Sequence, residues 1–184
     1  MKTNNFNEDF FLQIREQEAW TELSADSNFS WNEKLLERNK EKVNWSKISS
    51  NSAILWSSDM LDKFKSYIDW SELSGSGNSF LFSVDNLRKY KSHWNWKELS
   101  SNSSIMWNYN MIDEFADLIN WEELINMQSH TFRGQGIGDQ FPIRDFFEKY
   151  KSYFPISSLQ KSRLWEDIIE NDKKELAAKV LSEI

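Results

Sequence analysis

The chain has 184 residues, no cysteine and a formal net charge of −7, with a pI near 5.0. Without cysteine it can form neither a disulfide framework nor a thiolate metal site. Its acidity argues against general nucleic-acid binding and favours a basic partner. Aromatic residues make up 15% of a chain whose mean hydropathy is only −0.70. Their regular spacing argues against disorder.

The N-terminal segment 1–19 is expected to form a capping helix. Asn7 is its predicted N-cap, and Phe10, Phe11 and Ile14 share one face. The segment has no apolar core of signal-peptide length and carries acidic residues early. No window of the chain approaches the ~18 apolar residues that a membrane-spanning helix needs. We therefore expect a soluble, cytoplasmic protein that does not bind membranes.

A motif close to Trp-Ser-Glu-Leu-Ser recurs after the capping segment. Its leading tryptophans are separated by 25, 25, 26 and 25 residues, and they are Trp20, Trp45, Trp70, Trp96 and Trp121. A fixed period of this size is typical of a stacked array of structural repeats. We therefore expect repeats at 20–44, 45–69, 70–95, 96–120 and 121–155.

Each repeat is expected to open with a short helix at its leading tryptophan. Asp69 precedes Trp70, and Glu72 stands three residues after that aspartate. An Asp or Asn cap followed at this spacing by Glu predicts a capping box, in which the glutamate bonds back to the N–H of the cap. The pattern recurs in Asn95-Trp96-Lys97-Glu98 and Asn120-Trp121-Glu122-Glu123, whereas the copy at Asn44 has Lys47 in the glutamate position.

A second helix is predicted in each repeat by a second aromatic residue followed at once by a cap. These pairs are Trp31-Asn32, Trp56-Ser57, Phe82-Ser83 and Trp107-Asn108. An apolar residue four positions after each cap completes a hydrophobic staple. Apolar positions such as Leu61, Phe64 and Ile68 continue at helical spacing and predict about three turns. Each repeat should then be a short helix, a short turn and a longer helix.

The C-terminal part departs from this pattern. Residues 128–140, QSHTFRGQGIGDQ, replace the short turn of the fifth repeat and hold three of the chain's five glycines. Segment 156–184 is expected to hold a degenerate first helix beginning at Ile156 and a last helix at about 163–184. That helix should cap the array with an apolar face drawn from Leu164, Ile168, Ile169, Leu176, Val180 and Leu181.

These elements together predict an all-α fold over 1–184. A single repeat cannot bury its aromatic side alone, so neighbouring repeats must stack. The expected architecture is a right-handed-type α-solenoid of two-helix repeats with a capping helix at each end. The Trp-x-x-Leu-Ser motif with its second tryptophan, over roughly residues 20–125, resembles helical repeats of giant-virus proteins of unassigned function. The resemblance supports the helical array and implies no activity.

The insert 128–140 is the first candidate for partner binding. Repeat architecture does not require it, and insertions in arrays lie on one face, often the binding face. Its side chains suited to polar contacts are His130, Arg133, Gln135 and Asp139. The glycines resemble a phosphate loop only superficially, because the Walker lysine is absent. A plain flexible loop is the alternative.

Two columns of charge and the histidines are further candidates. Glutamates two positions after the leading tryptophans, among them Glu72 and Glu98, would form an acidic ridge in a stacked array. A lysine column, exemplified by Lys63, would form a basic one. Both also suit the partial charges at helix ends, so a structural role is the alternative. His93 and His130 fit no metal-binding spacing.

The functional hypothesis is a non-enzymatic protein-binding array without cofactor, metal or catalytic residues. Its concrete form is an immunity-type inhibitor or adaptor that occludes a basic protein partner. The alternative is a module that stacks sugars or nucleobases on exposed tryptophans, although core packing is the expected role of these residues, Trp94 included. An enzyme centred on His93 or His130 ranks third.

Overall fold

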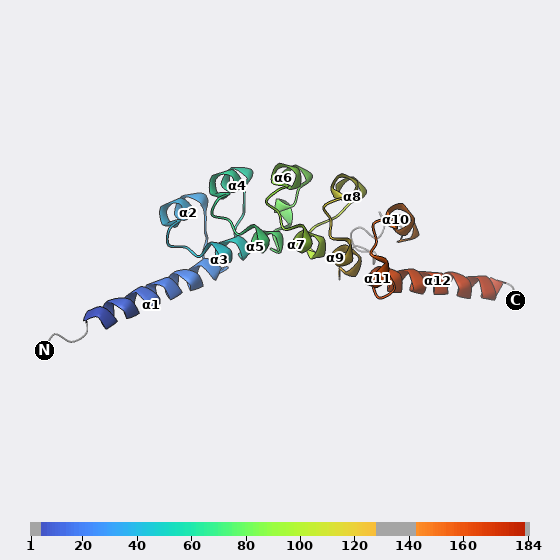
Figure 1. Ribbon diagram of the computed structural model, residues 1–184, viewed down its shortest axis with the longest axis horizontal. Helices are drawn as coiled ribbons and strands as arrows, with labels where there is room; N and C mark the ends of the chain where they lie inside the picture. Colours follow the sequence, from blue (N-terminus) through green and yellow to red (C-terminus); the bar gives the residue numbers. More distant parts are fainter. Residues whose placement is uncertain (1–4, 128–142, 183–184) are drawn as a thin grey trace. The chain divides into compact units, whose positions relative to one another are not determined.

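The computed structural model describes residues 5–127 and 143–182, and throughout these ranges its secondary structure is helical, without a strand (Figure 1). The all-α prediction is confirmed. The chain divides into two compact units, Met1–Trp94 and Asn95–Ile184. The insert 128–140 lies outside the described residues.

The first unit alternates helices of two kinds. The helices that contain a leading tryptophan succeed one another, with α1 in contact with α3 and α3 with α5. They are α1 (Asn5–Ala25), α3 (Trp45–Ser50) and α5 (Trp70–Ser74). The second helices lie side by side along the other edge (Figure 1). They are α2 (Glu33–Asn39), α4 (Ser58–Phe64) and α6 (Val84–Lys89), the last preceded by the 3-10 helix η1 (Ser79–Leu81).

The second unit repeats the alternation. Its first helices are α7 (Trp96–Ser101), α9 (Trp121–Asn126) and α11 (Ile156–Leu159). Its second helices are α8 (Tyr109–Phe115) and α10 (Ile143–Tyr150), and α12 (Arg163–Ser182) ends the described chain. Helix α9 contacts α7, α11 and α12, and α10 contacts α12. The degenerate first helix predicted at Ile156 is confirmed.

The predicted N-caps are confirmed wherever a leading or second aromatic marks a helix start from α2 to α9. At each cap, the side-chain oxygen accepts a hydrogen bond from a backbone N–H in the first turn, which satisfies a donor that has no partner within the helix. The capping residues are Asn32, Asn44, Ser57, Asp69, Ser83, Asn95, Asn108 and Asn120.

The predicted capping box is wrong in its second half, because a serine of the preceding repeat replaces the glutamate. The N–H of Asp69 donates to Oγ of Ser49 at 3.0 Å, and the N–H of Asn120 donates to Oγ of Ser100 at 2.9 Å. The N–H of Asn44 is likewise bonded to Ser24, at 3.0 Å. All three serines are fully buried. The serine of the Trp-x-x-Leu-Ser motif therefore links one repeat to the next.

Four of the five leading tryptophans are less buried than predicted. Trp20, Trp45, Trp70 and Trp96 are half-buried, and Trp121 is buried. The indole of Trp45 packs against Phe64 and Tyr67. Its N–H donates at 2.8 Å to the carbonyl of Lys40, the C-cap of α2. The ring thus bonds a carbonyl at the end of α2 that has no partner within the helix, and it packs against α4.

Trp94 and the second aromatics form the core as predicted, with one half-buried exception. Trp94, Trp31, Phe82 and Trp107 are buried, whereas Trp56 is half-buried. The aliphatic and aromatic residues around them reach complete burial in both units. They include Leu36, Ile48, Leu61, Phe64, Leu73 and Leu87 in the first unit, and Leu99, Ile112, Phe115, Leu124 and Phe146 in the second.

The second helices are shorter than the predicted three turns, at six to eight residues. In the second repeat the helix ends at Phe64, and the N–H groups of Tyr67 and Ile68 both bond back to the Phe64 carbonyl in a closing turn. The chain must then become extended at Asp69, which caps the next helix. The connection between the two helices is correspondingly longer, spanning 51–57 in that repeat.

The two terminal helices also differ from the prediction. Helix α1 begins at Asn5 and runs without a break through Trp20, so Asn7 is not its N-cap. Helix α12 buries Leu164 and Ile168, but Ile169, Leu176, Val180 and Leu181 are exposed. The predicted buried face of α12 is therefore wrong for four of its six residues. No described element covers its second half, so this face meets solvent.

Candidate functional site

The connections between first and second helices in the first unit are locked to one another by buried amides. The Asn78 side chain donates to the carbonyl of Ile54 at 2.7 Å. One repeat earlier, the Asn51 side chain donates to the carbonyls of Ser24 and Asp26, at 3.1 and 3.2 Å. Both asparagines are buried. Each connection is therefore held in place by the next one along the chain.

Large apolar side chains project to solvent from two of these interlocked connections. Leu55 is 77% exposed and Phe80 is 89% exposed, although the neighbouring Ile54 and Leu81 are almost completely buried. The buried neighbours anchor the backbone, so the exposed side chains are presented on a fixed support. Exposed apolar groups held together in this way are typical of protein interaction sites.

Acidic side chains stand beside these apolar groups. Asp59 and Asp85 lie in the first turns of α4 and α6, directly after the two connections, and both are exposed. The hydroxyl of Ser58 donates to the side-chain oxygen of Asn86 at 3.2 Å, which joins these two turns. We call Leu55, Asp59, Phe80 and Asp85 the loop-tip surface. It combines apolar and acidic groups, and Asp85 also bonds Arg88 of α6 at 2.9 Å.

The second unit presents the same kind of side chain at the equivalent position. Met106 directly precedes the second aromatic Trp107, as Leu55 precedes Trp56, and it is 70% exposed. Trp107 itself is completely buried. An exposed large apolar residue next to a buried one therefore occurs in three of the described connections, whereas the connection before Trp31 has Ser30 at the corresponding position.

The predicted lysine column forms ion pairs between consecutive second helices. Lys63 of α4 bonds Glu33 of α2 at 2.9 Å, and Lys89 of α6 bonds Asp62 of α4 at 2.6 Å. In the second unit, Lys149 of α10 bonds Asp113 of α8 at 2.7 Å. The column is thus engaged in joining repeats, which supports its structural interpretation.

Two of these carboxylates each also accept a hydrogen bond from a tyrosine hydroxyl. Tyr90 donates to Asp62 at 2.9 Å, and Tyr150 donates to Asp113 at 2.7 Å. The Lys89 ammonium, followed by the Tyr90 hydroxyl, lowers the pKa of Asp62. The Lys149 ammonium, followed by the Tyr150 hydroxyl, likewise lowers the pKa of Asp113. Burial and the bond to Asp113 raise the pKa of Tyr150. Both carboxylates therefore remain ionised at neutral pH.

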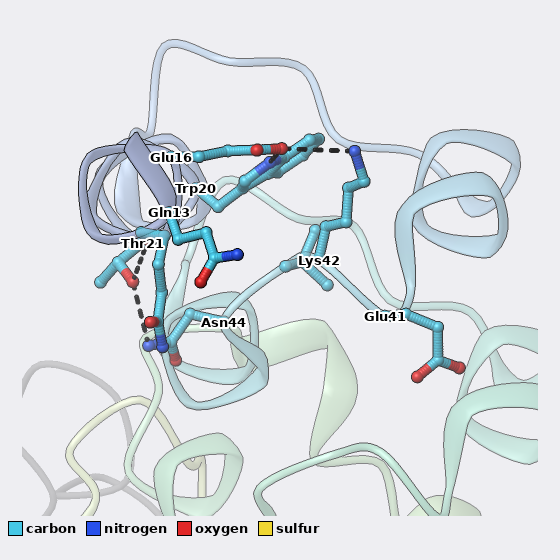
Figure 2. Close-up of a pocket in the computed structure, with 9 residues that line it drawn as sticks. Gln13, Glu16, Trp20, Thr21, Glu41, Lys42 and Asn44 are labelled. Atoms are coloured by element: carbon cyan, nitrogen blue, oxygen red, sulfur yellow. Dashed lines mark hydrogen bonds and ion pairs between the residues drawn. The ribbon is translucent and has the colours of Figure 1, made fainter. Parts of the chain in front are cut away.

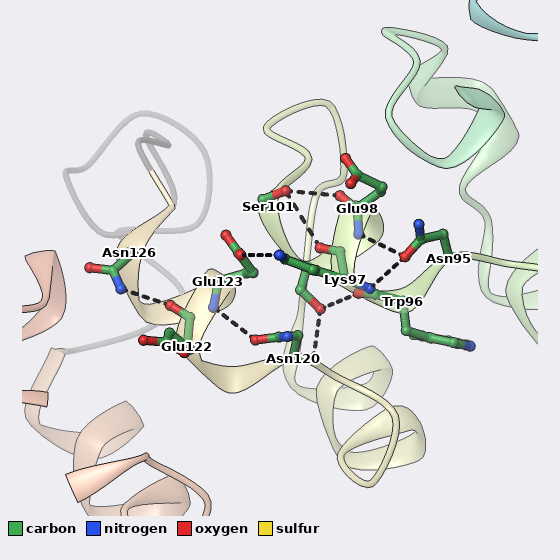
Figure 3. A network of polar contacts seen from close by, with 10 residues as sticks. Asn95, Trp96, Lys97, Glu98, Ser101, Asn120, Glu122, Glu123 and Asn126 are labelled. Atoms are coloured by element: carbon green, nitrogen blue, oxygen red, sulfur yellow. Dashed lines mark hydrogen bonds and ion pairs between the residues drawn. The ribbon is translucent and has the colours of Figure 1, made fainter. Parts of the chain in front are cut away.

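The members of the predicted glutamate column fall in both units and differ in exposure. Glu72 is exposed in α5 of the first unit, and Glu98 is half-buried in α7 of the second. The next member, Glu123 of α9, points toward Lys97 of α7 with 3.6 Å between the charged groups (Figure 3). At this step the acidic ridge is interrupted by a base.

His93 lies exposed in the turn after α6, with its ring edge against Trp70 at 4.9 Å between centroids. His130, Arg133, Gln135 and Asp139 lie outside the described residues. Across the described ranges, no group of three or more His, Asp or Glu side chains is placed to hold a metal ion.

The loop-tip surface was missed by sequence reasoning. The sequence pattern that marks such exposed apolar residues is a large apolar residue shortly before the second aromatic of a repeat. It occurs at Leu55, Phe80 and Met106. Two adjacent apolar residues gave no means of telling which one faces the core.

Comparison with protein-family models, characterised proteins and solved structures gives no match to this chain. The resemblance to giant-virus repeats stays a prediction. Among the helices of the described ranges, none combines the length and the apolar character needed to cross a membrane.

Proposed function

We propose that the chain is a right-handed-type α-solenoid that binds a basic protein partner through the loop-tip surface, without chemistry of its own. The observation that carries this proposal is the exposure of Leu55 and Phe80 on connections locked by the buried Asn78. A fixed support lowers the ordering cost of binding, because little of the surface must be immobilised when the partner docks.

The acidic composition supports a basic partner. A net charge of −7 accelerates encounter with a positively charged surface,. Asp59 and Asp85 then stand where they can meet basic side chains at the edge of the apolar contact. In its concrete form, the protein is an immunity-type inhibitor or an adaptor, which acts by covering a functional surface of the partner in the cytoplasm.

The alternative, stacking of sugars or bases on tryptophan, has less support. The Trp45 ring is packed against Phe64 and Tyr67, and the Trp70 ring against Tyr90, His93 and Trp94. Much of each ring face or edge is therefore already in contact with protein.

The test is affinity purification from the cells that make the protein, followed by calorimetry with each purified partner. The double variant Leu55→Ser, Phe80→Ser should lower affinity by at least tenfold. The control variant Ile169→Ser, which removes an exposed apolar residue from α12, should leave it unchanged. Equal affinity of the double variant and the unaltered protein would contradict the proposal. If the partner is an enzyme, stoichiometric loss of its activity distinguishes an inhibitor from an adaptor.

A further inference from the structure

Exposed large apolar residues gather on the two terminal helices, apart from the loop-tip surface. On α1 they are Phe10, Phe11 and Leu12, and on α12 they are Ile169, Leu176, Val180 and Leu181. Ile169, Leu176 and Val180 share one face of α12, because spacings of seven and four residues return to the same side of a helix. Such a stripe is what a helix presents to another helix.

Helix α1 is acidic, whereas the lysines of α12 all lie in its second half. Helix α1 contains five acidic residues, Glu8, Asp9, Glu16, Glu18 and Glu22, against the single base Arg15. The second half of α12 contains Lys173, Lys174 and Lys179. Arg144 of α10 bonds Asp172 and Glu175 at 2.6 and 2.7 Å, so the two acids of that region are already paired. Lys173 is also paired, with Glu170 at 3.5 Å, but residues 173–182 hold three lysines against one glutamate, so this half of α12 is basic as well as apolar.

A groove beside α1 already holds an ammonium group of its own unit, that of Lys42. It has a volume of about 370 Å³, and Glu16, Trp20 and Glu41 are among the residues that line it (Figure 2). Lys42 lies in the groove with its Nζ 3.4 Å from the Glu16 carboxylate and 5.5 Å from the centre of the Trp20 ring. A carboxylate beside an aromatic face is a favourable environment for a lysine.

We propose that the basic, apolar second half of α12 docks on α1 of a second copy of this chain, so that molecules associate head to tail. The apolar stripe of α12 packs against Phe10 and its neighbours, and the lysines of α12 meet exposed acidic residues of α1 such as Asp9. The contact is heterologous, since α1 meets α12 and not another α1. Such a contact continues from molecule to molecule unless it closes into a ring.

The experiment is sedimentation velocity at increasing concentration, with two complementary variants. Phe10→Glu disables the α1 surface, and Val180→Glu disables the α12 surface. The unaltered protein should grow beyond a dimer as its concentration rises, and each variant alone should remain a monomer. An equimolar mixture of the two variants should form dimers and nothing larger, because it holds one intact α1 surface and one intact α12 surface that can meet.

Three results would overturn the proposal. They are an unaltered protein that is monomeric at every concentration, a Phe10→Glu variant that still associates, and a mixture that stays monomeric. The second result would mean that α12 pairs with itself. Far-UV circular dichroism verifies that each variant is folded, and Leu176→Glu replaces Val180→Glu if the latter is not.

Two controls separate this contact from the proposed function. Phe80→Glu alters the loop-tip surface and should leave self-association unchanged. The charge variants Asp9→Lys and Lys179→Glu should each weaken self-association, most clearly at low ionic strength, where exposed charges are least screened. Loss of partner binding with intact self-association, or the reverse, shows which of the two surfaces has failed.

Discussion

The hydroxyl of Ser49 accepts a hydrogen bond from the backbone N–H of Asp69, 20 residues further along the chain, at 3.0 Å. Asp69 caps α5, and its own carboxylate accepts from the N–H groups of Ser71 and Glu72. Asp69 thus takes part in two capping interactions. Its side chain accepts hydrogen bonds from the first turn of the helix that follows, and its own N–H donates to a serine of the preceding repeat.

The first prediction concerns this bond. Ser49→Ala removes a buried acceptor and leaves the Asp69 N–H without its partner, so the free energy of unfolding should fall by about 1–3 kcal/mol. Ser50→Ala is the matched control, because the Ser50 hydroxyl is half-exposed and bonds only within its own helix, to the carbonyl of Ser46. Its effect should stay within about 0.5 kcal/mol. Urea unfolding of both variants checks the difference, and equal losses would contradict it.

The second prediction concerns Trp70, whose half-buried indole donates to the carbonyl of Lys65 at 3.0 Å. Trp70→Ala should cost about 2–3 kcal/mol, below the ~3–5 kcal/mol typical of a fully buried aromatic residue. Glu72→Ala, at an exposed position of the same helix, should change stability little. If urea unfolding gave the two variants the same stability, this would contradict the claim that Trp70 stabilises the packing between the second helices.

The third prediction concerns acid. The pKa of Asp113 is lowered in the folded chain by Lys149 and Tyr150, so its contribution to stability is complete above the ordinary aspartate pKa of ~3.9. It is lost as the pH falls through the lowered folded-state value. Asp113→Asn should therefore be destabilising at pH 7, and the difference from the unaltered protein should shrink toward pH 2. Thermal unfolding followed by circular dichroism across this range measures it.

The control for this prediction is Asp117→Asn, an exposed position just beyond α8. The midpoint difference between this variant and the unaltered protein should vary less with pH than that of Asp113→Asn. An Asp113→Asn variant whose midpoint falls in parallel with that of the unaltered protein would show that the Lys149 and Tyr150 contacts contribute nothing.

The fourth prediction concerns Asn78, whose amide donates to Ile54 beside the loop-tip surface. Asn78→Asp puts a carboxylate against that carbonyl in a buried place, and it should cost about 2–4 kcal/mol. Asn110→Asp, exposed in the first turn of α8, should be neutral or slightly stabilising,. Differential scanning calorimetry decides between them, and a neutral Asn78→Asp would mean that the two connections are not locked together.

The sequence predicted what is decided locally. A cap and the first helical turn are within three residues of each other, so Asn32 or Ser57 can be recognised from its neighbours alone. The role of Ser49 could not be predicted in this way, because its partner is 20 residues away, although its place in the recurring motif sets it apart from the serines of the loops. A helical pattern likewise shows that Leu176 and Val180 share a face, but not whether anything covers it.

The candidate site follows the same division. The fivefold recurrence of the motif located the connections in each repeat. Ile54 and Leu55 are both aliphatic, however, and nothing in the local pattern tells which one faces inward. The lysines were found as a column, whereas their carboxylate partners on the preceding helix, such as Asp62, required the stacking of α4 and α6 to become visible.

The link from serine to cap has a direction, and that direction agrees with the order of synthesis. The hydroxyl of Ser24 or Ser49 leaves the ribosome about 20 residues ahead of the N–H that it accepts from. A nascent chain that folds from its N-terminus therefore offers each emerging helix start an acceptor that is already in place. Loss of an upstream repeat would remove that acceptor from the helix after it, whereas loss of a downstream repeat would leave only a hydroxyl that water can satisfy.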